Sequence, residues 1–457
     1  MARLWFRSAL LPDGWAEGVA LEIRDGRIAT VTRAVPAAAG DETGGIAIPG
    51  LPNLHSHAFQ RGMAGLAERR GTSRDSFWTW REVMYRFVDR MDPDDAEAVA
   101  AQAYVEMLEA GFTRVGEFHY LHHDPAGTPY ADPAEMAARL AAAAGETGIG
   151  LTLLPVFYAH GGFGPIRGAG PQPPSPGQRR FVSDRDGFAA LMAGSRRAVA
   201  GLPDAVIGIA PHSLRAATPA EIAALLPLAE GGPVHIHVAE QVREVEECRA
   251  ATGARPVEHL LDHAPVDARW CLIHATHISE TETRRLARSG AVAGLCPITE
   301  ANLGDGLFPL PAFAREGGRF GIGSDSNVLV SAAEELRLLE YGQRLAARLR
   351  NVVTSPHSLS TGRALVEGCL AGGSQALGMA GGLAPGAPAD IITLDPDHPA
   401  LAARSGDAWL DGWIFAARET AVESVWRAGR RVVAQGRHLR RDAVAARFRA
   451  TLARLAA

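Results

Sequence analysis

The chain of 457 residues is 47% apolar and 21% charged, which is typical of a globular protein with one large domain and a smaller one beside it. Its formal net charge of −5 gives no indication of nucleic-acid binding, and no apolar run is long enough to span a bilayer. The N-terminal residues contain no continuous apolar segment of the kind found in signal peptides. We therefore expect a cytoplasmic protein that binds neither nucleic acid nor membrane.

Cysteine usage and the absence of lysine exclude several kinds of chemistry. The four cysteines form no C-x-x-C pair, so we expect no disulfide framework, and the zinc nucleobase deaminases that carry P-C-x-x-C are excluded. Every basic residue other than histidine is an arginine. A lysine Schiff base, a P-loop lysine and a metal pair bridged by a carboxylated lysine are therefore excluded as well.

Both ends of the chain have the alternating pattern of β-strands. Near the N-terminus, "VALEIRDGRIATVTRA" consists of two alternating runs around Asp25 and Gly26, which predicts a hairpin. Near the C-terminus, "APADIITLDP" predicts a strand, and "SVWRAGRRVVAQGR" predicts a hairpin that turns near Gly429. We expect residues 1–47 and 376–445 to form one small β-sandwich domain, with a helix over 446–457.

Between these ends, β-rich runs alternate with helical stretches. The runs are "GIAIPGLPNLHSH", "TRVGEF", "GLTLLPVFY", "AVIGIAPH", "PVHIHVAE", "WCLIHAT", "AVAGLCP" and "FGIGSDS". The clearest helical stretches are "PDDAEAVAAQAYVEMLEAG", "DPAEMAARLAAAAGETG" and "SAAEELRLLEYGQRLAARL". This alternation predicts a (β/α)8 TIM-like barrel over 48–375, and no G-x-G-x-x-G follows the first run to favour a dinucleotide fold. Residues 160–180, rich in Gly and Pro, predict a long loop that could be a lid or a tolerated insertion.

Metal-binding types of side chain lie at the ends of several predicted strands. The strands end in His55 and His57, in Glu117, His119 and Tyr120, in His212 with Arg215 beyond it, in His235, His237 and Glu240, in His274, and in Asp325. In a barrel these carboxyl ends meet on one face, where such enzymes keep their active sites. Imidazoles with a carboxylate suit Zn²⁺, with Fe²⁺ or Mn²⁺ as alternatives. We expect one divalent metal, although Glu117 could bridge a second.

This combination resembles the amidohydrolase superfamily, and more narrowly its mononuclear-zinc aminohydrolase branch, which replaces C–NH2 or C=NH by C=O. The resemblance is carried by the H-x-H of the first strand, "HVAE" on the fifth, and the strand-end His274 and Asp325. The stretch "GGLAPGAPADIITLD" resembles the usual return into the small sheet domain. Further motifs resemble members that convert N-formimidoyl-L-glutamate to N-formyl-L-glutamate and ammonia in histidine degradation: "LPNLHSHAFQRGMAG", "FWTWREVMY", "GEFHYLHH", "PHSLRA", "HVAEQ" and "LCPITEANLGDGLFP". The chain departs from them at residues 164–178, where its loop looks extended.

The resemblance implies a ligand set for the metal, namely His55, His57, His237 and Asp325. From spacing alone, His235 remains a rival of His237, because both lie on the same face of one strand. We prefer His237 because Glu240, three residues further on, matches the branch's proton-transfer acid. The other histidines near or beyond the strand ends are expected to be structural or exposed: His119, His122, His123, His259, His263 and His277.

The resemblance also implies roles for the remaining candidates. Asp325 would take the proton of the attacking water, Glu240 would protonate the imine nitrogen, and His274 would orient the water and stabilise developing charge. A small-molecule dicarboxylate needs cationic forks, for which Arg215 and Arg81 are the candidates. Additional hydrogen bonds to the substrate are expected from Gln60, Tyr120 and His212.

Two alternative functions remain open at this point. The first is another aminohydrolase of the same superfamily that acts on a purine, pyrimidine or triazine, whose site would need aromatic stacking and fewer paired arginines. The second is a non-catalytic barrel with a structural metal, which would be fully coordinated and leave no open position. We also expect the protein to be a homodimer.

Overall fold

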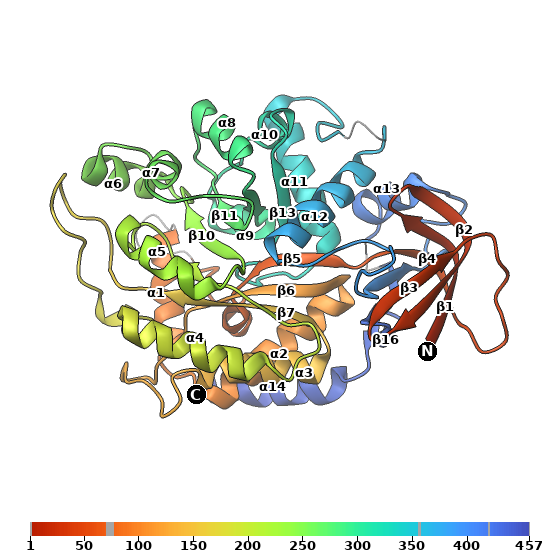
Figure 1. Ribbon diagram of the computed structural model, residues 1–457, viewed down its shortest axis with the longest axis horizontal. Helices are drawn as coiled ribbons and strands as arrows, with labels where there is room; N and C mark the ends of the chain where they lie inside the picture. Colours follow the sequence, from red (N-terminus) through yellow and green to blue (C-terminus); the bar gives the residue numbers. More distant parts are fainter. Residues whose placement is uncertain (1, 70–76, 355–357, 419–420, 457) are drawn as a thin grey trace.

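The computed structural model describes residues 2–69, 77–354, 358–418 and 421–456 (Figure 1). An eight-stranded sheet forms one end of the molecule, at the right of Figure 1, and parallel strands surrounded by helices form the rest. The described part of the chain therefore has α/β content, with the parallel strands concentrated in the middle of the sequence.

The eight-stranded sheet combines strands from the two ends of the chain in the order β17-β16-β15-β14-β4-β1-β2-β3. Strands β1 and β4 pair in parallel and the other neighbours are antiparallel. Both predicted hairpins are confirmed, because Arg24 pairs with Arg27 across Asp25-Gly26, and Arg427 pairs with Arg430 across Ala428-Gly429. The strands are β1 (Ala2–Leu11), β2 (Gly14–Arg24), β3 (Arg27–Thr32), β4 (Glu42–Pro49), β14 (Ile391–Leu394), β15 (Val422–Arg427), β16 (Arg430–Ala434) and β17 (Arg437–His438).

The middle of the chain forms two parallel sheets, one ordered β5-β6-β7-β8 with β9 paired to β7, and the other ordered β10-β11-β12-β13. Isolated parallel bridges join the edges of these sheets, one between Ser56 and Asp325 and another between Ile209 and Val234. The strands are β5 (Leu51–Ser56), β6 (Phe112–His119), β7 (Gly150–Phe157), β8 (Val206–Ile207), β9 (Ala210–Pro211), β10 (Val234–Val238), β11 (Trp270–His274), β12 (Val292–Leu295) and β13 (Arg319–Ile322).

Two of the predicted strands are divided in the structure. The first run separates at Gly50 into β4, which joins the eight-stranded sheet, and β5, which starts the parallel sheet. A side chain at Gly50 would collide with Thr113, whose Oγ1 would lie 2.4 Å from the added Cβ, so the chain needs glycine where it passes between the sheets. The fourth run separates into β8 and β9, with Gly208 against the carbonyl of Pro233 between them.

Helices cover the outside of the parallel strands (Figure 1). The three helical stretches singled out in the sequence are confirmed as α2, α3 and α11, and α2 begins at a capping box made by Asp92 and Asp95. The helices are α1 (Phe77–Val88), α2 (Pro93–Glu109), α3 (Glu135–Thr147), α4 (Arg185–Val199), α5 (Pro219–Leu225), α6 (Val242–Thr252), α7 (Pro256–His263), α8 (Glu280–Ser289), α9 (Pro297–Leu303), α10 (Leu310–Arg315), α11 (Ala332–Ala347), α12 (Thr361–Ala376), α13 (Asp407–Phe415) and α14 (Arg441–Ala456). Helix α14 packs along α2, and it begins at Arg441, before the predicted start at residue 446.

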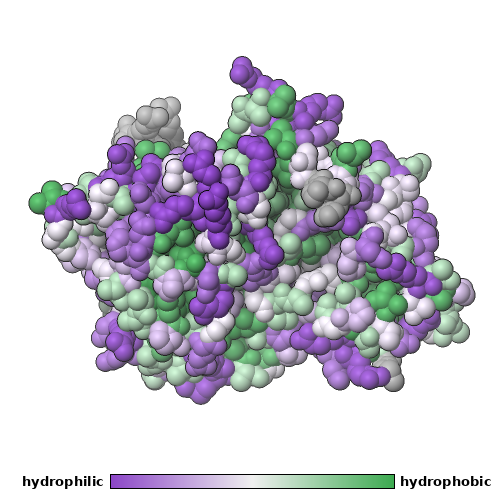
Figure 2. Space-filling model, turned by 45° about the horizontal axis from the view of Figure 1, so that its top comes forward, coloured by the Kyte–Doolittle hydropathy of each residue, from purple (hydrophilic) through white to green (hydrophobic). Residues whose placement is uncertain are grey.

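Five of the parallel strands, β5, β6, β7, β10 and β11, are buried along their length, as expected for strands covered by helices on their outer face. Figure 2 shows polar side chains projecting from one face of the molecule, with apolar residues gathered between them. All four cysteines are buried and free. In the described part of the chain, none of the helices is long and apolar enough to cross a membrane.

Candidate active site

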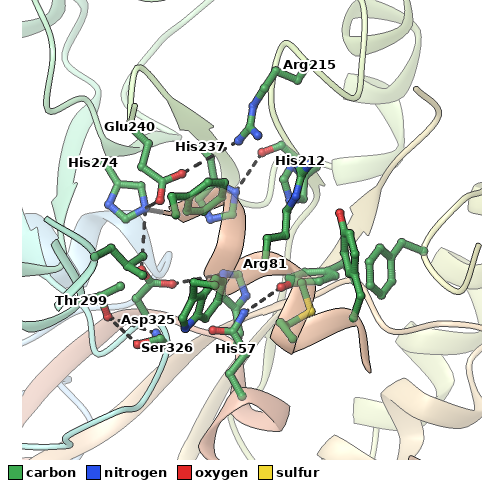
Figure 3. A pocket seen from close by; sticks show the side chains of 18 of the residues that line it. His57, Arg81, His212, Arg215, His237, Glu240, His274, Thr299, Asp325 and Ser326 are labelled. Atoms are coloured by element: carbon green, nitrogen blue, oxygen red, sulfur yellow. Dashed lines mark hydrogen bonds and ion pairs between the residues drawn. The ribbon is translucent and has the colours of Figure 1, made fainter. Parts of the chain in front are cut away.

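Four side chains from three strand ends form a group with the composition of a metal site. One ligand atom from each of His55, His57, His237 and Asp325 lies within 4.8 Å of the others, and all four residues are buried. The Nε2 atoms of His55 and His237 are 3.0 Å apart, and the Nε2 of His57 is 3.2 Å from Oδ1 of Asp325. Figure 3 shows three of these residues, His57, His237 and Asp325, lining one pocket.

Backbone hydrogen bonds bring these residues together and orient their rings. The amide of Asp325 donates to the carbonyl of His55, and the amide of His57 donates to the carbonyl of Asp325, both at 2.9 Å. The Nδ1–H of His57 donates to the carbonyl of Phe118 at 2.8 Å, and that of His237 donates to the carbonyl of His212 at 3.1 Å. Each bond leaves the Nε2 of its ring facing the group as an acceptor, which is the arrangement that metal-binding histidines need.

The geometry and charge of the group fit a divalent metal. Tetrahedral zinc with bonds of about 2.0–2.1 Å separates its ligand atoms by about 3.3 Å, close to the contacts seen here. Burial lowers the pKa of His57 and His237, and it lowers that of His55 to about 3, so the rings are neutral and able to coordinate. Although burial opposes it, contact with the His55 ring and the charge of His274 lower the pKa of Asp325, which keeps this carboxylate ionised.

Two other metal candidates lie outside this group. The Nε2 of His235 donates instead to the carbonyl of Ala376 at 2.8 Å, inside the protein. Glu117 accepts the amide N–H of Ala58 at 2.7 Å, and burial raises its pKa to about 8. Neither side chain belongs to the group of four, although His235 shares a strand face with His237.

Beside the group, Glu240 and His274 face each other across the pocket. The Nε2 of His274 lies 3.9 Å from Oε1 of Glu240 and 3.8 Å from Oδ2 of Asp325. Burial raises the pKa of Glu240 to about 7, so that near neutral pH a large share of this carboxyl carries a proton. Burial disfavours the charged imidazolium of His274, but Glu240 and the neighbouring carboxylates raise its pKa to about 10.

The structure adds Glu300 to this part of the site, a residue that the sequence did not single out. Its Oε1 accepts the Nδ1–H of His274 at 3.2 Å and the amide N–H of Cys296 at 3.0 Å. The ring of His274 is therefore held with Nε2 toward the pocket. The backbone is also unusual here, because His274 and Asp325 have φ angles of +67° and +46°, and such left-handed conformations at non-glycine residues cluster at functional sites.

The pocket is also lined by two arginines, Arg81 on α1 and Arg215, which follows β9. Arg215 is 7% exposed, and its Nη2 lies 3.9 Å from Oε2 of Glu240. Arg81 is half-buried, with its guanidinium 4.6 Å from the ring centre of Trp78. Neither guanidinium Nε has a hydrogen-bond partner among the described residues. Two cations with unsatisfied donors at one end of a pocket can bind an anionic ligand.

The three predicted hydrogen-bonding residues also line this pocket. The Nε2 of Gln60 donates to the hydroxyl of Tyr120 at 2.8 Å, and the Oε1 of Gln60 has no partner among the described residues. The Nδ1 of His212 lies 3.1 Å from the hydroxyl of Ser213. The sequence analysis missed the apolar side of the pocket, which is formed by Phe77, Trp80, Met84, Tyr85, Tyr158 and Phe181.

The remaining histidines have structural or exposed positions. His119 and His122 are buried, and the Nε2 of His122 donates to the carbonyl of Val156 at 2.9 Å. His123 donates in the same way to the carbonyl of Val182 at 2.7 Å. His259, His263 and His277 lie away from the pocket. In the long loop, Gly162 bridges to Gln172, and Phe181, just beyond it, lines the pocket.

Comparison with known proteins places this architecture in a family. Residues 46–432 match the model of the amidohydrolase family, so the chain belongs to that family. Residues 1–45 match the model described as the N-terminal domain of formimidoylglutamate deiminase HutF. The family match covers all four residues of the metal-type group and both arginines.

Comparison with individual proteins shows which members of the family the chain is similar to. The chain is 51% identical over 441 residues to formimidoylglutamate deiminase of Pseudomonas aeruginosa, covering 96% of each protein. It is 30% identical over 376 residues to 5-methylthioadenosine/S-adenosylhomocysteine deaminase of Natronomonas pharaonis, covering 80% of this chain and 77% of that one. The crystal structure of an amidohydrolase from Brucella melitensis superposes with a TM-score of 0.95 at 55% identity, covering all of both chains.

Proposed function

We propose that the protein is a metal-dependent hydrolase that converts N-formimidoyl-L-glutamate and water to N-formyl-L-glutamate and ammonia, a step of histidine degradation. The observation that carries this proposal is the composition of one pocket, which is lined by three of the four residues of the metal-type group, by the proton donor Glu240, and by Arg81 and Arg215. The 51% identity to a formimidoylglutamate deiminase over 96% of both chains supports the same activity.

The ligand set we propose is His55, His57, His237 and Asp325, with Zn²⁺ as the metal and Fe²⁺ or Mn²⁺ as alternatives. Zinc is supported by the imidazole-rich ligands, and an adenosine deaminase of the same fold from Xanthomonas campestris contains bound zinc. His57, His237 and Asp325 all line the pocket, so the side of the group that faces it is open to a small molecule. A purely structural metal would be closed on every side, which argues against the non-catalytic alternative.

When bound, the metal supplies a Lewis acid that lowers the pKa of a water molecule. The carboxylate of Asp325 then accepts a proton as the water oxygen bonds to the formimidoyl carbon. Glu240 gives its proton to the terminal imine nitrogen, which receives the electron pair of the breaking C=N π bond. The Nε2 atom of His274 is held between Glu240 and Asp325. It stabilises the charge that develops on the groups bonded to the formimidoyl carbon.

Ammonia leaves in the second half of the reaction. The proton taken up by Asp325 passes to the amino group of the tetrahedral intermediate, and the C–N bond breaks. The hydroxyl group of the intermediate gives its proton to the carboxylate of Glu240 as the carbonyl of the N-formyl product forms, which restores both side chains. The raised pKa of Glu240, about 7, suits the first transfer because the carboxyl can hold a proton near neutral pH and release it readily. Glutamate thus serves as acid and aspartate as base because their surroundings shift the two pKa values in opposite directions.

Arg215 and Arg81 are the residues we propose for the two substrate carboxylates. Each offers a planar fork of N–H donors, and the pocket between them and the metal-type group can take a short, extended molecule. Gln60, Tyr120 and His212 lie along this pocket and can hydrogen-bond the substrate between its two ends. Aromatic side chains also line the pocket, so a nucleobase is the competing substrate that an experiment has to include.

The test is ammonia release by the metal-loaded protein, measured with N-formimidoyl-L-glutamate, guanine, cytosine and adenosine in parallel, together with metal analysis of the same sample. We expect activity with N-formimidoyl-L-glutamate and about one divalent metal per chain. If kcat/KM is higher with guanine, cytosine or adenosine than with N-formimidoyl-L-glutamate, the protein is a purine or pyrimidine deaminase. Absence of bound metal in a fully active sample would contradict the proposed mechanism.

We further propose that the two parallel sheets belong to one (β/α)8 barrel over residues 48–375. The bridges between Ser56 and Asp325 and between Ile209 and Val234 support this, because they join the edges of both sheets. The sheet made by both chain ends supports a separate small domain over 1–47 and 376–445. The homodimer and the cytoplasmic location stay predictions from the sequence, and analytical ultracentrifugation checks the first.

A further inference from the structure

A buried carboxylate lies behind the turn that carries Glu240. Glu244, in the first turn of α6, is 0% exposed, and it belongs neither to the metal-type group nor to the residues that line the pocket. Its Oε1 accepts the amide N–H of Ala239 at 3.1 Å, and its Oε2 accepts the amide N–H of Glu240 at 3.2 Å. Both oxygens are therefore used to hold two consecutive backbone amides between β10 and α6.

These bonds differ from ordinary helix capping. A glutamate at the third position of a helix usually bonds the amide of the N-cap residue, which here is Gln241. Glu244 instead reaches past Gln241 to the two residues before it. One of them, Ala239, has a φ angle of +52°, a conformation that is unfavourable for any residue with a side chain. The carboxylate thus stabilises the turn that carries Glu240. Figure 3 shows the side chain of Glu240 in the pocket.

We propose that Glu244 is a positioning residue that aims Glu240 at the imine nitrogen. This inference rests on the function proposed above and on the role of Glu240 within it. It adds a buried carboxylate, outside the pocket lining, on which the position of the proton donor depends.

The test compares Glu244→Gln with Glu246→Gln, an exposed glutamate two residues further along the same helix. Glutamine keeps the size of the side chain but loses the charge and presents an N–H₂ group to one of the two amides. We expect Glu244→Gln to keep its metal and lose about 10²-fold in kcat on N-formimidoyl-L-glutamate, since small misplacements of a catalytic group have effects of this size. Glu246→Gln should match the wild type. Equal kcat values for the two variants would overturn the proposal.

A double variant separates positioning from support of the fold. If Glu244 acts through Glu240, then Glu244→Gln should lower kcat by less than about threefold in a Glu240→Gln background, because the group it positions is already lost. A full 10²-fold further loss would show that Glu244 acts elsewhere. Wild-type protein without activity on N-formimidoyl-L-glutamate would overturn the proposed function, whereas an active wild type with an unaffected Glu244→Gln overturns only this inference.

If Glu244→Gln does not fold, Ala239→Gly combined with Glu244→Gln provides the same test. Glycine adopts the positive φ of residue 239 without the steric penalty, so the turn depends less on the two hydrogen bonds. We expect this variant to fold, bind metal and keep the low kcat, while Ala239→Gly alone retains more activity than the double variant. A double variant with the kcat of Ala239→Gly alone would overturn the proposal.

Discussion

The two ends of the pocket are built differently. At the metal end, histidine rings project from strand ends, and backbone carbonyls such as that of Phe118 fix their orientation. At the recognition end, Arg81 comes from helix α1 and Arg215 from a loop, and their main described contacts are aromatic rings and the carboxylate of Glu240, 3.9 Å from Arg215. We propose from this comparison that the metal end, held rigid by these bonds, performs the chemistry, and that the recognition end, the more adaptable of the two, selects the substrate.

The largest expected effect comes from removing a ligand at the rigid end. His57→Ala and His237→Ala should lose both the metal and the activity, because each ring contributes one of only four converging atoms. His235→Ala is the matched control, since its ring bonds the carbonyl of Ala376. Metal analysis and ammonia release on the purified variants check this. Retained metal in His237→Ala, with loss in His235→Ala, would reverse the assignment.

Glu240→Gln should keep the metal and the fold and lose about 10²–10⁴-fold in kcat, the usual cost of removing a positioned general acid. The glutamine cannot donate the proton that the imine nitrogen needs. Steady-state kinetics with N-formimidoyl-L-glutamate and metal content of the same sample measure the effect. Near-normal turnover would show that Glu240 is not the proton donor and is an ordinary carboxylate at the start of a helix.

At the recognition end, Arg215→Ala should cost about 2–5 kcal/mol, as expected when one partner of a buried charge pair is removed. This corresponds to roughly a 30- to several-thousand-fold loss in kcat/KM. Arg215→Lys should recover only part of the loss, because lysine lacks the planar fork. Full recovery in Arg215→Lys would mean that a point charge is sufficient at this position.

Arg81→Ala should have the smallest effect, about tenfold in kcat/KM or about 1.4 kcal/mol, because solvent screens a half-buried cation. The change should appear mainly in KM, since the proposed role of Arg81 is to bind a substrate carboxylate and not to act on the formimidoyl carbon. A loss as large as that of Arg215→Ala would show that both arginines are equally desolvated when the substrate is bound.

The metal end could be predicted from the sequence because strand geometry is regular. His55 and His57 are two residues apart, so they had to share a face, and the ends of parallel strands meet at one edge. The structure brings these rings together with His237 and Asp325, as this reasoning predicted. Spacing could not separate His235 from His237, because only their different depths along the strand place one in the group and the other against Ala376.

The recognition end and the supporting carboxylates could not be predicted in the same way. The aromatic residues of α1 form an obvious motif, "FWTWREVMY", but its place over the pocket depends on how the helix packs. Glu300 and Glu244 look like ordinary helix glutamates, and only tertiary contacts show that they hold His274 and the Glu240 turn. The division of the first strand at Gly50 likewise depends on a contact with Thr113 from a distant part of the chain.

The most direct test of this division of labour is a ratio of kcat/KM values. Wild type, Arg215→Ala and Arg81→Ala are each measured with N-formimidoyl-L-glutamate and with an N-formimidoyl alkylamine that lacks both carboxylates. We expect the wild type to prefer the glutamate derivative, and both variants to lose more activity on it than on the alkylamine, because only the first substrate can pair with the guanidinium groups. Equal proportional losses on both substrates, or a wild type that prefers the alkylamine, would contradict the account.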